Sequence, residues 1–207
     1  MKKTILLVTL TAMSFMVSCS EDDNTATRGV QLQAHDDNEM MDTMHTMMDA
    51  MAAMEMTHDP DVDFAAMMIM HHEGAIAMAG LELQEGSNAE IKAVAEGIIA
   101  AQQQEIQELE GILAGISADE MDMEFMEEQM NGMDRMDAMA DQQMITGDTD
   151  NDFASLMIIH HQAAMDSASS YLHHGSNPEL IAMANMIIEA QSAEIIALSN
   201  WLAENRR

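Results

Sequence analysis

The stretch "DFAAMMIMHHEGAIAMA", residues 63–79, recurs 89 positions later as "DFASLMIIHHQAAMDSA", residues 152–168. A second motif repeats at the same offset, as "GSNAEIKAVAEGIIAAQQQEIQEL" at 86–109 and "GSNPELIAMANMIIEAQSAEIIAL" at 175–198. Over the aligned segments 63–114 and 152–203, 25 of 52 positions are identical. An internal duplication is the simplest explanation of such a repeat.

Each unit is predicted to contain three helices: a Met-rich helix, a His-His helix and a Gln-x-x-Glu helix. Placed at 100° per residue, the apolar side chains of each segment fall on one arc, and no stretch shows the alternation of a strand. Asp61 or Asp63 is suited to cap the first His-His helix, as Asp150 or Asp152 is in the copy. The sequence therefore predicts an all-α fold. We expect the two His-His and two Gln-x-x-Glu helices to form a four-helix core about a pseudo-twofold axis, with the Met-rich helices packed beside it.

The N-terminal segment reads as a targeting signal. "MKKTILLVTLTAMSFMVSC" has Lys2 and Lys3, then an apolar run too short to span a membrane comfortably, then small residues before Cys19. This pattern resembles a bacterial lipoprotein signal, with Cys19 lipidated and anchoring the chain to a membrane. We expect a signal peptide at 1–18, a flexible tether at 19–38, and repeat units at 39–115 and 116–207 that together form one domain.

The charge of the chain restricts its partners. The formal net charge is −30, which repels the phosphates of nucleic acids and attracts cations. Cys19 is the only cysteine, so no disulfide within the chain is possible. No Ser-His-Asp order, phosphate loop or reactive cysteine supports hydrolase or nucleotide chemistry, and we expect no enzyme.

Four polar positions, eight residues in all, carry the same residue in both units, and helix capping does not explain why these residues were retained. Other polar positions, such as Glu82 and its counterpart Tyr171, have diverged as surface positions do. The surviving residues lie on or beside the apolar arcs, where a carboxylate needs a partner or a metal. We expect His71 and His160 to approach Glu105 and Glu194, either directly or through a metal. Two interpretations stay open: a hydrogen-bonded core that organises the bundle, or a transition-metal site. The candidate ligands are His71, His72, His160, His161, Glu105, Glu194, Gln102 and Gln191.

The methionines favour the metal interpretation. The chain has 27, and the segment 40–56 holds eight, whereas the Gln-x-x-Glu segments use Ile and Leu freely. Methionines at helical spacing usually fill cores, but thioethers are also soft ligands that select Cu(I). We expect Cu(I) to bind a helix over 40–56, and a mixed Met–His site there would also tolerate Cu(II). The candidates are Met44, Met47, Met48, Met51 and His45, with edge sites at Met68 and Met157 beside His72 and His161.

The paired "DFAxxMIxxHHxxA" and "AQxxEI" motifs resemble the family named domain of unknown function 305. The resemblance covers residues 40–114 and 129–203. It implies an extracytoplasmic, ferritin-like helical bundle in which some members bind copper through Met and His and contribute to copper tolerance. The matching residues here are the two His pairs and Gln102, Glu105, Gln191 and Glu194.

Together these features predict an extracytoplasmic lipoprotein of the bacterial envelope that binds a metal. It would be anchored in the outer membrane and face the periplasm or the cell surface. Copper as Cu(I) is favoured, and another transition metal is the nearest substitute. One alternative is a ferritin-like di-metal oxidase or metal store, although the usual Glu-x-x-His signature is missing from both units. The other alternative is a structural surface lipoprotein with a His/Glu core. The sequence leaves the oligomeric state open.

Overall fold

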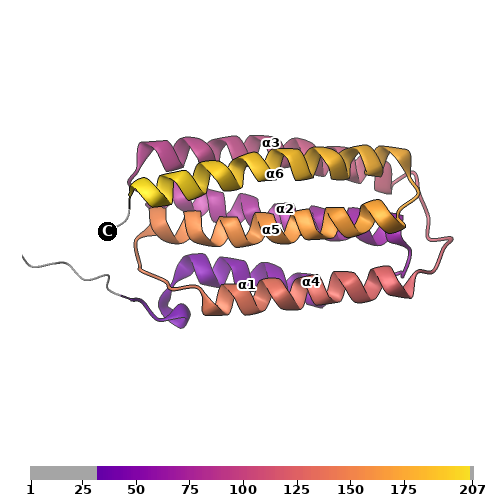
Figure 1. Cartoon of the computed structure of the whole chain (residues 1–207), viewed down its shortest axis with the longest axis horizontal. Helices are drawn as coiled ribbons and strands as arrows, with labels where there is room; N and C mark the ends of the chain where they lie inside the picture. The colour runs from indigo at the N-terminus through magenta and orange to yellow at the C-terminus, as the bar shows by residue number, and fades with distance from the viewer. Residues whose placement is uncertain (1–31, 206–207) are drawn as a thin grey trace, which may run out of the picture.

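The computed structural model describes residues 32–205, and this part of the chain contains six α-helices, a short 3-10 helix and no strand. The helices, shown in Figure 1, are α1 (Glu39–Ala52), α2 (Pro60–Glu85), α3 (Ala89–Leu113), α4 (Met123–Gln142), α5 (Thr149–His174) and α6 (Pro178–Glu204), and the 3-10 helix is η1 (His35–Asp37). The helices lie in three layers of two, with α3 and α6 in one outer layer, α2 and α5 in the middle, and α1 and α4 in the other outer layer.

The middle layer joins the two units. α2 packs against α3 in the first unit and α5 packs against α6 in the second, while α2 and α5 contact each other within the middle layer. The Met-rich helices α1 and α4 cover the remaining face of α2 and α5. The predicted all-α fold, with a four-helix core from the duplication and additional Met-rich helices, is therefore confirmed.

The His-His helices begin earlier than the sequence suggested. The N-cap of α2 is Asp59, whose carboxylate accepts from the N–H of Val62, and the N-cap of α5 is Asp148. The prediction that Asp61 or Asp63, and their copies, cap these helices is wrong. Asp63 instead accepts from the backbone N–H of Thr57 and His58, so it holds the turn that precedes the helix.

The other aspartates of the first turn connect the two units reciprocally. Asp61 of the first unit accepts hydrogen bonds from the backbone N–H groups of residues 176–177, at the start of α6. Asp150 of the second unit accepts the equivalent bonds from residues 87–88, at the start of α3. Since each unit satisfies free N–H groups at a helix start of the other, the caps stabilise the two units together.

Glu82 and Tyr171 are not surface residues, although their divergence suggested it. Both side chains are fully buried at the ends of α2 and α5. The Tyr171 hydroxyl donates to Asp61, and the Glu82 carboxyl forms the equivalent hydrogen bond with Asp150. Each side chain lies so close to the glycine after its helix, Gly86 or Gly175, that any Cβ there would overlap it. Both glycines have an extended backbone, so a left-handed conformation is not the reason for glycine here. Glycine is required because the neighbouring side chain leaves no room for a Cβ.

Part of the predicted tether 19–38 packs on the bundle. The backbone N–H of Gln33 donates to the carbonyl of Ile145 at 2.8 Å, and Asn38, the N-cap of α1, is buried. The tether prediction is therefore wrong for residues 33–38. The predicted signal peptide at 1–18 and the lipidation site Cys19 lie outside the described residues.

Two further helix properties bear on the sequence predictions. The Met-rich helix α1 ends at Ala52, four residues before the end of the segment 40–56, so Met54 and Met56 lie beyond it. Of the helices in residues 32–205, α6 alone is long and apolar enough to cross a membrane by length and composition. Core helices of soluble bundles meet the same criterion, and α6 packs against α5.

Candidate metal centre

Four histidines are buried at the contact between α2 and α5. His71 is 3% exposed, and His72, His160 and His161 are fully buried. The rings of His71 and His160 pack against each other with centroids 3.7 Å apart, and the Nε2 of His160 hydrogen-bonds to the His71 carbonyl at 3.0 Å. The first histidine of each pair thus meets its counterpart at the contact between the units.

The second histidine of each pair, not the first, contacts a glutamate. His72 Nε2 lies 2.7 Å from a carboxylate oxygen of Glu105, and His161 Nε2 lies 2.8 Å from Glu194. The prediction that His71 and His160 contact the glutamates directly is therefore wrong, whereas an approach through a bound metal stays a prediction. Adjacent residues point about 100° apart on a helix. Because α2 packs on α5 and α3 in different directions, the first histidine faces α5 and the second faces α3.

Burial keeps the two central imidazoles neutral. The pKa of His71 is lowered well below its usual range by burial first and by the neighbouring histidines second. The pKa of His160 is lowered for the same reasons. A neutral imidazole is the form that binds metal ions.

Several buried polar atoms at this centre have no hydrogen-bond partner among the described residues. Both ring nitrogens of His71 and the side-chain amides of Gln102 and Gln191 are in this state. An unsatisfied buried polar atom costs roughly 1–3 kcal/mol, and a bound ion or water is a common explanation for it. His71 differs from the two glutamines because it also lines a cavity.

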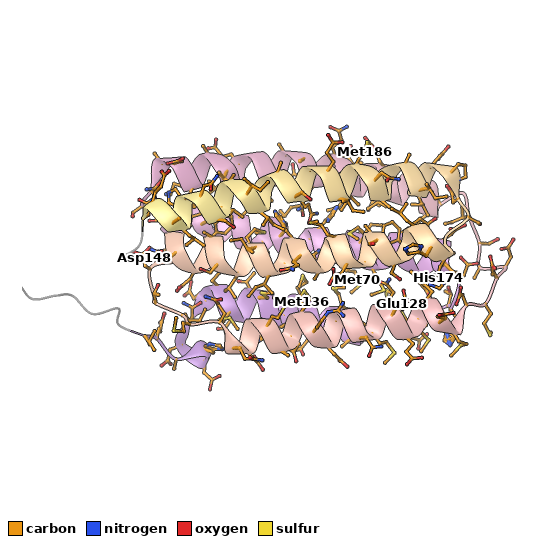
Figure 2. All side chains as sticks on the ribbon, in the orientation of Figure 1. Met70, Glu128, Met136, Asp148, His174 and Met186 are labelled. Atoms are coloured by element: carbon orange, nitrogen blue, oxygen red, sulfur yellow. The ribbon has the colours of Figure 1, made fainter. Side chains whose placement is uncertain are left out.

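A cavity of about 400 Å³ lies between α4 and the middle layer, and His71 forms part of its wall. Its buried lining contains Met51, Met67, Met68 and Met136, and Met133 is half-buried at the edge. Exposed polar side chains, among them Glu128, Arg135 and Asp166, line the solvent side. Figure 2 shows Met136 and Glu128 on α4, the helix that forms one wall.

The cavity exists in this half of the bundle because the duplicated units have diverged. Its lining includes Gln129, Ser167 and Ser170, and the Ser167 hydroxyl donates to the Gln129 amide oxygen at 2.6 Å. The 89-residue offset places Met40, Met78 and Leu81 at these three positions in the first unit. There, Met40 and Met78 are buried in the core and Leu81 packs against it. Smaller or polar side chains thus line the cavity under α4 at positions where the first unit has large apolar side chains under α1.

The predicted thioether ligands separate into two groups. Met51 and Met68 line the cavity, and Met48 and Met51 line a smaller space of about 150 Å³ between α1 and α4. Met44 and Met157 are fully buried in the core, and Met47 packs against α2 where a Cβ at Gly74 would overlap it. The predicted stripe is therefore not a single metal-facing surface.

The edge sites and His45 also lie differently from the prediction. His72 faces Glu105 on α3, so it does not join Met68 toward the Met-rich helix. His161 faces Glu194 on α6 in the same way. His45 points across to α4, where its Nε2 lies 3.2 Å from Asp141, and not toward the thioethers of α1.

The sequence interpretation missed three of the methionines that line the cavity. Met133 and Met136 occupy the same repeat positions as Met44 and Met47, and this alignment was the signal that could have identified them. Met67 gave no such signal, because its counterpart in the second unit is Leu156.

The donor set of the cavity suits a soft metal ion. Thioethers favour Cu(I), and a neutral imidazole binds copper in either oxidation state. Residues 32–205 contain no cysteine that could supply a thiolate, and Arg135 is paired with Asp166 at 3.0 Å. This arrangement can bind and shield a metal ion.

Sequence comparison assigns the chain to a family. The model of the domain of unknown function DUF305 matches residues 10–113 and again residues 61–202, and the chain belongs to this family. The first match covers the first unit, and the second match runs from α2 of the first unit into α6 of the second. No curated protein sequence matches the chain.

Solved structures of a copper-binding protein resemble this bundle. CopM in its Cu(I)-bound form is 32% identical with a TM-score of 0.54, over 71% of this chain and 98% of CopM. CopM in its Cu(II)-bound form is 31% identical with a TM-score of 0.52, over 70% and 96%. A DUF305 fragment from Deinococcus radiodurans, at 20% identity and a TM-score of 0.53 over 70% and 96%, supports the fold alone. CopM also has Ag-bound forms, so these relatives are described by the metals they hold and not by a reaction.

Proposed function

We propose that this chain binds copper, as Cu(I), in the thioether cavity, and that it does so in the bacterial envelope as a lipoprotein anchored through Cys19. The observation that carries the proposal is His71, whose buried and unbonded imidazole lines a cavity together with methionines from three helices. The resemblance to CopM in Cu(I), Cu(II) and Ag forms supports copper as the metal.

The cavity explains why a protein outside the cytoplasm would use methionine. Thioethers bind soft ions without deprotonation, and they avoid the easy oxidation of thiolates. The net charge of −30 attracts cations, and Glu128 and Asp166 place carboxylates where the cavity meets solvent. The ion would then lie between Met51, Met68, Met133, Met136 and His71.

Competition with a Cu(I) chelator under reducing conditions tests the proposal. The variant Met68→Leu/Met133→Leu removes two cavity thioethers, and Met41→Leu/Met44→Leu removes two fully buried core thioethers. Leu keeps similar volume, so both should fold. We expect the cavity variant to lose at least about tenfold in Cu(I) affinity, equivalent to about 1.4 kcal/mol, and the core variant to bind like wild type. Equal affinities of all three proteins would refute the cavity site.

A structural role for the outer histidine–glutamate pairs is the second candidate function, and it is favoured by a specific observation. In both pairs, His72–Glu105 and His161–Glu194, an imidazole nitrogen lies within hydrogen-bonding distance of the carboxylate. Glu105→Ala would leave the buried His72 unpaired and should cost roughly 1–3 kcal/mol of unfolding free energy. If the pairs are structural, the loss measured in urea is the same with copper and with a copper chelator present.

The membrane anchor has an independent test. In cells given labelled palmitate, the wild-type chain should take up label and sediment with membranes, and Cys19→Ser should do neither. A Cys19→Ser chain that still carries the label would exclude lipidation at this residue.

A further inference from the structure

A second group of metal-ligand side chains lies across the two Met-rich helices. His45 of α1 faces Asp137 and Asp141 of α4, and the three ligand atoms lie within 4.8 Å of one another. Among residues 32–205 this is the one group of three histidine, cysteine, aspartate or glutamate side chains whose ligand atoms come so close. Its donors are nitrogen and oxygen, whereas those of the cavity are mainly sulfur.

We propose that His45, Asp137 and Asp141 form a separate site for a divalent transition-metal ion, with Cu(II) as the ion used to test it. Imidazole nitrogen with carboxylate oxygen is a donor set typical of Cu(II), which prefers nitrogen and oxygen, whereas thioethers prefer Cu(I). The two carboxylates balance the charge of a divalent ion. All three side chains are at least partly exposed, so an ion can reach them and water can complete its coordination.

The duplication shows that the fold itself does not require this group. The 89-residue offset relates His45 to Asp134, Asp137 to Met48 and Asp141 to Ala52. The corresponding place on the other side of the α1–α4 contact therefore has one carboxylate and no imidazole. The packing of α1 on α4 tolerates either set, which makes Asp134 a matched control for the proposed ligands.

A methionine-lined space links the proposed site to the cavity. Asp137 also lines the small space between α1 and α4, together with Asp49, Asp134 and the methionines Met48, Met51, Met133 and Met136. Met51, Met133 and Met136 line the large cavity as well. Of the three proposed ligands, Asp137 is thus the one that lines the same space as the thioethers.

Titration with one equivalent of Cu(II) under air, followed by electron paramagnetic resonance and calorimetry, tests the site in the mature chain. We expect His45→Gln and Asp141→Asn each to weaken Cu(II) binding at least about tenfold, and His45→Gln to remove nitrogen coupling from the spectrum. The control Asp134→Asn should bind like wild type, although it changes the charge by the same amount as Asp141→Asn. Because all four side chains are at least partly exposed, these variants should keep their fold.

Two results would overturn the site. In one, His45→Gln binds Cu(II) as wild type does. In the other, Asp134→Asn weakens binding as much as Asp141→Asn, which would show attraction by net charge alone. The outcome is separable from that of the cavity, because Met68→Leu/Met133→Leu should retain Cu(II) binding here while losing Cu(I).

Discussion

Replacing Glu82 with Gln should stabilise the protein at neutral pH, although it changes a buried side chain. Glu82 is fully buried and forms a hydrogen bond with Asp150. Burial first, and Asp150 second, raise the pKa of the Glu82 carboxyl from 4.5 to about 8. The folded protein therefore holds Glu82 protonated at pH 7, as a donor to Asp150, where the second unit uses the hydroxyl of Tyr171.

The size of the effect follows from proton linkage. Between pH 4.5 and about 8 the unfolded chain has released this proton and the folded chain still holds it. The free energy of unfolding therefore falls by about 1.4 kcal/mol per pH unit over this window, and the dependence ends above it. The total is roughly 5 kcal/mol. Gln donates to Asp150 through its amide and has no proton that titrates. The unfolding free energy of the variant therefore does not fall with pH through this position.

Urea unfolding at several pH values between 5 and 8, followed by the fluorescence of Trp201, measures the difference between variant and wild type. Trp201 is the only tryptophan and is buried, so its emission should report unfolding. The advantage of Glu82→Gln should grow with pH, while Glu85→Gln, at an exposed position near the same helix end, is the charge-matched control. A difference that stays constant from pH 5 to 8 would refute the protonated Glu82.

Three further outcomes are expected. His58→Gly should raise the unfolding free energy measured in urea by about 1 kcal/mol, because His58 has a left-handed φ of 72° that glycine adopts without strain. Its counterpart Gly147 has the same φ, so Gly147→Ala should lower the unfolding free energy. His71→Leu should leave the unfolding free energy of the metal-free protein unchanged or raise it by about 1 kcal/mol, since neither ring nitrogen has a hydrogen-bond partner in the described part of the chain. The same variant should weaken Cu(I) binding in chelator competition. Below pH 6.5 the unfolded chain protonates His71 and His160, whereas burial keeps both neutral in the folded chain, so the unfolding free energy should fall with decreasing pH. His71→Leu should reduce that slope by about 1.4 kcal/mol per pH unit.

The sequence by itself determined the fold class and the repeat. Helical periodicity and the 89-residue offset predicted six helices in two units, and the structure has α1 to α3 and α4 to α6 in that order. The surviving histidines and glutamines also marked the buried centre, and the two surviving glutamates lie half-buried beside it. Periodicity and the internal repeat can both be read from the sequence alone. An apolar arc shows that a helix has a buried face, whichever element covers that face.

The tertiary structure decided which helix covers each face. His71 and His72 adjoin in sequence, yet one meets His160 and the other meets Glu105, because α5 and α3 lie on different sides of α2. Periodicity also could not separate Met44, which fills the core, from Met51, which lines the cavity. That distinction depends on the volume of side chains from other helices, and volume left unfilled is a property of the packed bundle that no single helix carries.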